Sequence, residues 1–144
     1  LHQYFKTPGQ AGGTRSFWIA KDLAERGMEV VIISGRHNES MKTEIEYIEK
    51  FKVIFIHEPY DNKMSILSRL RAFLSFSIKS SLLLVKEKKV NLVFATSTPL
   101  TIGIPALVSK VFKGTPYVFE VRDLWPEVPI QMGGLKNSIL IHFA

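Results

Sequence analysis

Short apolar runs alternate with helix-length segments along this chain. Four runs predict buried strands, because near-continuous apolar composition is typical of strands covered on both faces. These strands are expected at residues 29–34, 52–57, 90–95 and 116–121. Segments with apolar residues at helical spacing predict helices at 15–25, 66–85 and 100–112. The alternation predicts an α/β fold with a Rossmann-like, mostly parallel sheet and helices on both of its faces.

Glycine and proline positions agree with these boundaries. Gly27 and Gly114 follow the first and third predicted helices, and Pro105 is compatible with a helix only in its first turn. Residues 8–14 form a Gly-rich loop, before which Tyr4 and Phe5 are interpreted as the end of a first strand. The polar, poorly periodic residues 35–50 carry no predicted element.

Composition narrows the class of partner. The 144 residues have the size and apolar content of one domain, and they contain no cysteine, which excludes disulfides and thiolate chemistry among them. The four histidines lack metal-binding spacing, so we expect no metal site. The net charge of +6 predicts an anionic partner, and without a nucleic-acid-binding motif we expect no nucleic acid. No signal-peptide pattern opens the sequence, so a cytoplasmic location is expected.

Three loops are expected at the edge where parallel strands end, which is where such sheets bind ligands. These loops are residues 9–14, 96–100 and 122–128. The first opens a helix, so its glycine amides can approach an anion, although a tight turn also needs glycine. The hydroxyls of Thr96, Ser97 and Thr98 can line a ligand site or cap the next helix, and capping is the favoured interpretation.

Charged residues and a tryptophan cluster where the last predicted strand ends. Glu120 lies in an apolar strand and needs a partner, for which Arg122, two residues along the same face, is the expected choice. Asp123, Trp125 and Glu127 follow directly. The cluster predicts chemistry at this edge, and the alternative is a structural ion pair with packed aromatic and proline residues.

Segments 116–127 and 95–103, together with Gly12-Gly13-Thr14-Arg15, resemble the amino-terminal domain of family 4 glycosyltransferases of the GT-B fold. The nearest resemblance is to bacterial fucosamine-transferase-like enzymes that make surface polysaccharides of the cell envelope. It implies transfer of a sugar, with retention of configuration, from a nucleotide-diphosphate sugar to a lipid-linked or polysaccharide acceptor, without a cofactor. Residues 1–144 would be the acceptor-side half, truncated at both ends, inactive alone and lacking the donor-binding domain.

The resemblance also implies roles for individual residues. The donor diphosphate would bind at Gly12, Gly13, Thr14 and Arg15. Many relatives have a histidine at the position of Arg122, and a guanidinium cannot act as a base, so Arg122 would stabilise charge. Glu120 and Asp123 would position the acceptor or accept its proton, which makes Glu120, Arg122 and Asp123 the catalytic candidates. The cleft would be lined by Thr96, Ser97, Thr98, Trp125 and Glu127.

Residues 70–85 are apolar on more than one helical face, and basic residues follow, so that residues 70–89 could lie on an anionic membrane. A helix buried against the sheet is the favoured alternative. The contact would be peripheral, at the inner face of the cytoplasmic membrane.

A non-catalytic α/β module that binds an anionic ligand or a membrane surface is the alternative function. A nicotinamide-dependent oxidoreductase is disfavoured because the glycine spacing is wrong for a dinucleotide.

Overall fold

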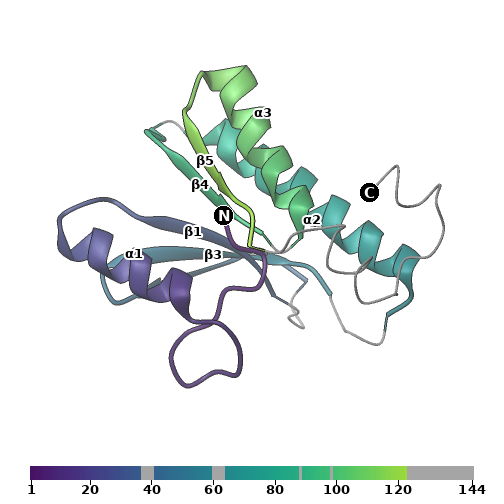
Figure 1. Ribbon diagram of the computed structural model, residues 1–144, viewed down its shortest axis with the longest axis horizontal. Helices are drawn as coiled ribbons and strands as arrows, with labels where there is room; N and C mark the ends of the chain where they lie inside the picture. The colour runs from purple at the N-terminus through teal and green to yellow at the C-terminus, as the bar shows by residue number, and fades with distance from the viewer. Residues whose placement is uncertain (37–40, 60–63, 88, 98, 123–144) are drawn as a thin grey trace.

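The computed structural model describes residues 1–36, 41–59, 64–87, 89–97 and 99–122. Within them helices and strands alternate as the sequence predicted, and the α/β class is confirmed (Figure 1). In chain order the elements are α1 (Arg15–Glu25), β1 (Val31–Arg36), β2 (Glu44–Ile48), β3 (Phe51–His57), α2 (Ile66–Lys86), β4 (Val93–Thr96), the 3-10 turn η1 (Leu100–Ile102), α3 (Gly103–Lys113) and β5 (Tyr117–Glu120).

The strands form two sheets where the sequence predicted one. One sheet has the order β1-β3-β2, in which β1 and β3 are parallel and β2 is antiparallel to β3. The other sheet is the parallel pair β4-β5. The structure therefore shows a mixed three-stranded sheet beside a two-stranded parallel sheet.

Residues 1–3 lie between these two sheets and bond to both of them. Tyr4 and Phe5, predicted as the end of a strand, belong to no ladder, because the chain turns at residues 3–4. The backbone bonds run from His2 N to Ile33 O (3.1 Å), from Gly35 N to Gln3 O (2.9 Å), from Leu1 N to Phe94 O (2.6 Å) and from Thr96 N to Leu1 O (3.1 Å). Through these bonds the carboxyl ends of β1 and β4 are held side by side.

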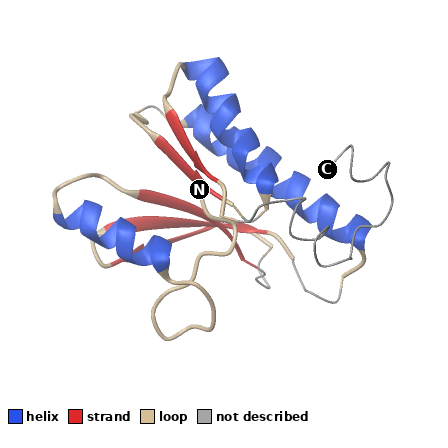
Figure 2. Ribbon diagram, in the orientation of Figure 1, coloured by secondary structure: helices blue, strands red, loops and turns tan. Residues whose placement is uncertain are grey.

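Helices cover both faces of the sheet formed by β1 and β3 (Figure 2). Alternate residues of a strand point to opposite faces, so Ile32 packs toward α1, whereas Ile33 packs toward α2 and α3. The α1 side buries Phe5, Phe17, Ala20, Ala24, Ile32, Phe51, Val53 and Phe55. The opposite side buries Ile33, Ile54, Ile56, Phe76, Leu84, Val93, Ala95, Ile102 and Ala106.

The helices begin and end where the glycine and proline positions predicted. Gly27 and Gly114 have φ of 86° and 69°, the left-handed conformation that ends helices at low cost in glycine. Pro105 is the third residue of α3, where its missing N–H breaks no helical bond. Strand β2 was not predicted, because two of the five residues in its Glu-Ile-Glu-Tyr-Ile sequence are charged and it pairs with only one neighbour.

Helix α2 is apolar on two faces, and the structure separates them. Phe76 and Leu84 are buried against the sheet, whereas Leu74 and Ile78 are exposed. The favoured prediction, a helix buried between the sheet and a neighbouring helix, is confirmed for the face that carries Phe76 and Leu84, whereas the outer face is exposed. In the described part of the chain, none of the helices has the combination of length and hydropathy needed to cross a bilayer.

Candidate functional site

Residues far apart in the sequence meet at the carboxyl ends of β4 and β5. Arg15, in the first turn of α1, forms an ion pair with Glu120 at the end of β5. The hydroxyl of Thr96, at the end of β4, donates a 2.6 Å hydrogen bond to the same carboxylate oxygen of Glu120. The structure thus brings together the start of α1 and the ends of β4 and β5, which adjoin the three loops predicted at this edge.

Ser97 fixes the backbone that leaves β5. Its amide donates to the carbonyl oxygen of Glu120 (2.9 Å), and its hydroxyl oxygen accepts a hydrogen bond from the amide of Arg122 (2.8 Å). Neither Thr96 nor Ser97 caps the next helical segment, which follows Pro99 and has no side-chain cap. The favoured capping role is therefore wrong for these two residues, because neighbouring strand ends offer their hydroxyls other partners.

The predicted ion pair between Glu120 and Arg122 is also replaced. Strand β5 ends at Glu120, so the rule that residues two apart share a face stops applying before Arg122 is reached. The partner of Glu120 is instead Arg15, which lies 105 residues earlier. Arg122 is left to face the Gly-rich loop: its Nη2 lies 4.0 Å from the position a Cβ would take on Gly13.

These partners change the acidity of Glu120. The hydrogen bond from Arg15, followed by the one from Thr96, lowers the pKa of Glu120 from 4.5 to about 2. The charge of Arg122 acts in the same direction. A carboxylate with so low a pKa is a weak proton acceptor near neutral pH, so Glu120 acts here as an anchor for Arg15 and Thr96.

A cavity of about 200 Å³ lies between the Gly-rich loop and Arg122. Gly12 has a φ of 126°, which a residue with a side chain rarely adopts, and a Cβ there would come within 3.2 Å of the Lys6 side chain. Glycine at this position therefore keeps both the loop conformation and the opening. The lining consists of His2, Tyr4, Lys6, Gly12, Gly13 and Arg122.

The charges around this cavity favour an anion. Lys6 and Arg122 contribute two cationic side chains to the lining. Helix α1 begins beside it at Arg15, its first turn holds no acidic residue, and the hydroxyl of Thr14 makes no capping bond. No acidic residue of the first turn therefore offsets the positive end of the dipole of α1. This arrangement can bind a phosphate or diphosphate group.

His2 is a lining residue that the sequence analysis missed. Its side chain is buried, and its Nδ1 has no hydrogen-bond partner in the described part of the molecule. Burial, followed by the positive charges of the chain's amino group, Arg122 and Arg15, lowers the pKa of His2 from 6.5 to about 4. Lys6 could have been expected from its place beside the Gly-rich loop, whereas nothing in the sequence distinguishes His2.

Acidification is expected to weaken the contact between Arg15 and Glu120. Because the folded pKa of Glu120 lies below its ordinary value, the pair stabilises the fold above pH 4.5, and this contribution is lost as the pH falls to 2. The loss should be about 1 kcal/mol or less, since the pair is partly exposed. Urea unfolding of the native protein and of Glu120→Gln across this pH range measures it. Equal pH dependence of the two proteins would contradict the prediction.

Four predicted site residues lie outside the described part of the chain: Thr98, Asp123, Trp125 and Glu127. In the part that is described, no group of three or more His, Asp and Glu side chains is arranged to hold a metal ion. The site consists of an anion-sized cavity and the ion pair beside it. Comparisons of the chain with protein-family models, with curated proteins and with solved structures found no match.

Proposed function

We propose that this chain is the acceptor-side domain of a retaining glycosyltransferase, which moves a sugar from a nucleotide-diphosphate sugar to a lipid-linked or polysaccharide acceptor. The observation that carries the proposal is the meeting of Gly12, Gly13 and Arg122 around one cationic cavity. These residues come from the two ends of the described chain and belong to the segments that resemble family 4 glycosyltransferases. The reaction would take place in the cytoplasm or at the inner face of the cytoplasmic membrane.

The strand arrangement supports a Rossmann-like domain. With residues 1–3 placed between β1 and β4, the hydrogen-bonded order is β2-β3-β1-(1–3)-β4-β5. Without the antiparallel edge strand β2, this is the order 3-2-1-4-5 of a doubly wound sheet when residues 1–3 are counted as the first strand. The cavity then lies beside that central segment, at the position where the direction of winding changes and such sheets bind ligands.

The chemistry required is stabilisation of a leaving diphosphate. In the transfer, an acceptor oxygen forms a bond to the anomeric carbon while the bond to the diphosphate breaks and its electron pair stays on the diphosphate. Arg122, Lys6 and the loop amides would offset this developing charge. A volume of about 200 Å³ is smaller than most pockets for whole ligands, so the cavity would hold the phosphate portion of the donor.

The low pKa of Glu120 favours a positioning role for this residue and leaves proton acceptance to another carboxylate. Glu120 would position Arg15 and Thr96, through which the Gly-rich loop stays aligned with the end of β5. Proton acceptance from the acceptor hydroxyl would fall to Asp123 among the carboxylates named from the sequence. Arg122 would be the residue in direct contact with the diphosphate.

Diphosphate binding is the first expected result of this proposal. Isothermal titration of the 144-residue protein with uridine diphosphate should show binding that Arg122→Gln weakens by about 10- to 100-fold, because a charge-assisted hydrogen bond is lost. Arg26→Gln is the matched control, since Arg26 lies at the far end of α1 and pairs with Asp22. Equal weakening by the two variants would contradict a specific role for Arg122.

Sugar transfer tests the reaction itself. The 144-residue protein and the complete product of its reading frame would be given radiolabelled nucleotide sugars and a polyprenyl-diphosphate-linked acceptor. Transfer by the complete product that Arg122→Gln abolishes would support the proposal. Diphosphate binding without transfer in any form of the protein would instead favour the non-catalytic anion-binding module.

A further inference from the structure

The outer face of α2 carries a straight row of exposed aliphatic side chains. They recur every three or four residues over five turns, so they form one stripe along the helix, about 27 Å long at 1.5 Å per residue. Their exposed fractions range from 40% for Val85 to 80% for Leu67. The stripe consists of Leu67, Leu70, Leu74, Ile78, Leu82 and Val85.

The charged side chains of helix α2 all have one sign. Helix α2 has four basic residues and no Asp or Glu. Arg71, Lys79 and Lys86 are spaced eight and seven residues apart, so they lie along the same flank of the stripe. Arg71 and Lys86 make no ion pair with any residue that the structure describes. An open hollow of about 510 Å³ lies along the first half of the stripe, between its apolar side chains and the stems of Arg71 and Lys79.

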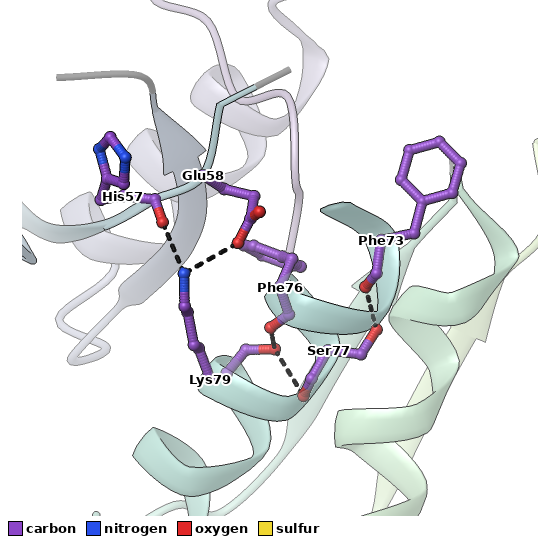
Figure 3. A network of polar contacts seen from close by, with 7 residues as sticks. His57, Glu58, Phe73, Phe76, Ser77 and Lys79 are labelled. Carbon is purple, nitrogen blue, oxygen red and sulfur yellow. Dashed lines mark hydrogen bonds and ion pairs between the residues drawn. The ribbon is translucent and has the colours of Figure 1, made fainter. Parts of the chain in front are cut away.

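The packing of α2 fixes how this face is presented. On the opposite side of the helix Phe76 and Ser77 are buried. Lys79, at the flank of the stripe, donates hydrogen bonds to the carbonyl oxygen of His57 (2.9 Å) and to the carboxylate of Glu58 (3.0 Å) (Figure 3). These contacts attach the middle of α2 to the core and to the end of β3. The helix therefore cannot insert end-on, and its stripe can only lie flat against a surface.

Its side chains favour lipid over protein as that surface. The residues that dominate binding at protein interfaces are enriched in Trp, Tyr and Arg, whereas this stripe is entirely aliphatic. A second copy packed on this stripe would bring two basic flanks together, with no Asp or Glu in either α2 helix to pair with Arg71 and Lys86. An apolar stripe with a basic flank is the pattern of a helix that lies in the headgroup region of an anionic bilayer.

We propose that α2 is a membrane-docking helix whose stripe enters the surface of an anionic phospholipid bilayer while Arg71 and Lys86 contact the lipid phosphates. This surface lies on the outer face of α2 and does not depend on the proposed sugar transfer. Failure of either proposal can therefore be recognised without the other.

Vesicle flotation tests the proposal with the 144-residue protein. Binding is expected to vesicles that contain phosphatidylglycerol, and much less to vesicles of phosphatidylcholine alone. Arg71→Gln combined with Lys86→Gln should lower the partition coefficient about 10- to 30-fold, given roughly a fivefold effect for each basic residue near the surface. Leu74→Ser combined with Ile78→Ser should lower it about 10-fold or more.

Exposed positions on α3 supply the matched control. Leu107 and Val111 are as exposed as the stripe residues, so Leu107→Ser with Val111→Ser removes similar apolar area from a different helix and should leave flotation unchanged. Circular dichroism establishes that all variants stay folded. Equal loss in the α2 and α3 variants would overturn the assignment to α2. Failure to bind anionic vesicles, or a dimer in sedimentation that Leu74→Ser with Ile78→Ser dissociates, would overturn membrane docking itself.

Discussion

Replacing Phe76 with alanine is expected to lower the free energy of unfolding by about 3–5 kcal/mol, the usual cost of removing a buried phenyl ring from a core. Phe76 has no exposed surface and belongs to the core cluster between α2 and the sheet, with Ile33 and Ile56. Its ring also lies beside Gly35 of β1, where an added Cβ would stand 3.6 Å from it. Urea denaturation measures the change through the transition midpoint at an unchanged slope.

Leu74 provides the control on the same helix. Two residues before Phe76, it is half exposed and faces away from the sheet. Leu74→Ala should therefore change the free energy of unfolding by no more than roughly 0.5 kcal/mol, the usual range for surface positions. A large loss in Leu74→Ala, or a small one in Phe76→Ala, would show that α2 packs with its other face inward.

Lowering the pH from 7 to 4 is expected to destabilise the native protein by up to about 3 kcal/mol more than it destabilises His2→Leu. The folded pKa of His2, about 4, lies below its ordinary value of 6.5 because the side chain is buried. The unfolded chain therefore takes up a proton on His2 at a pH where the folded chain does not. The contribution of neutral, buried His2 to the free energy of unfolding is therefore fully present above pH 6.5 and is lost as the pH falls toward 4.

Leucine is the informative replacement, because it fills a similar apolar space, cannot titrate, and does not require a partner for the buried Nδ1 that has none. Guanidinium unfolding of both proteins at several pH values gives the difference directly. Parallel pH curves for the native protein and His2→Leu would contradict the prediction. They would mean that His2 is protonated without global unfolding, through local opening of the segment that carries it.

The sequence predicted elements whose signals are local. Gly27 and Gly114 end helices wherever they follow an apolar helical pattern, and the apolar runs of β1 and β3 require burial on both faces, so these elements lie within a few residues of their expected places. Residues 90–92 extended the predicted fourth strand beyond β4, because an apolar pattern does not say where the neighbouring strand stops. Strand β2 was missed because two of its five side chains are glutamates, and charged side chains are common on an exposed edge strand.

The site required knowledge of partners far along the chain. The sequence predicted that Gly12, Gly13 and Arg122 belong to one edge, since that follows from the order of strands and helices. The choice of Arg15 as the partner of Glu120 depends on how α1 lies relative to β5, which no local pattern specifies. For the same reason, the hydroxyls of Thr96 and Ser97 could be assigned to a cap when their partners are residues of a neighbouring strand end.

The bond between Arg15 and Glu120 has a consequence for the order of folding. During synthesis α1 can pack on β1 and β3 once residue 57 has left the ribosome, because these elements already share a core. The wall of the cavity formed by Arg122 cannot assemble until more than sixty further residues have followed. Contacts of such sequence separation form slowly, since a long loop must close first. A nascent chain paused before β5 would therefore carry a folded Gly-rich loop with no anion site, and ligand binding would report that this site is complete.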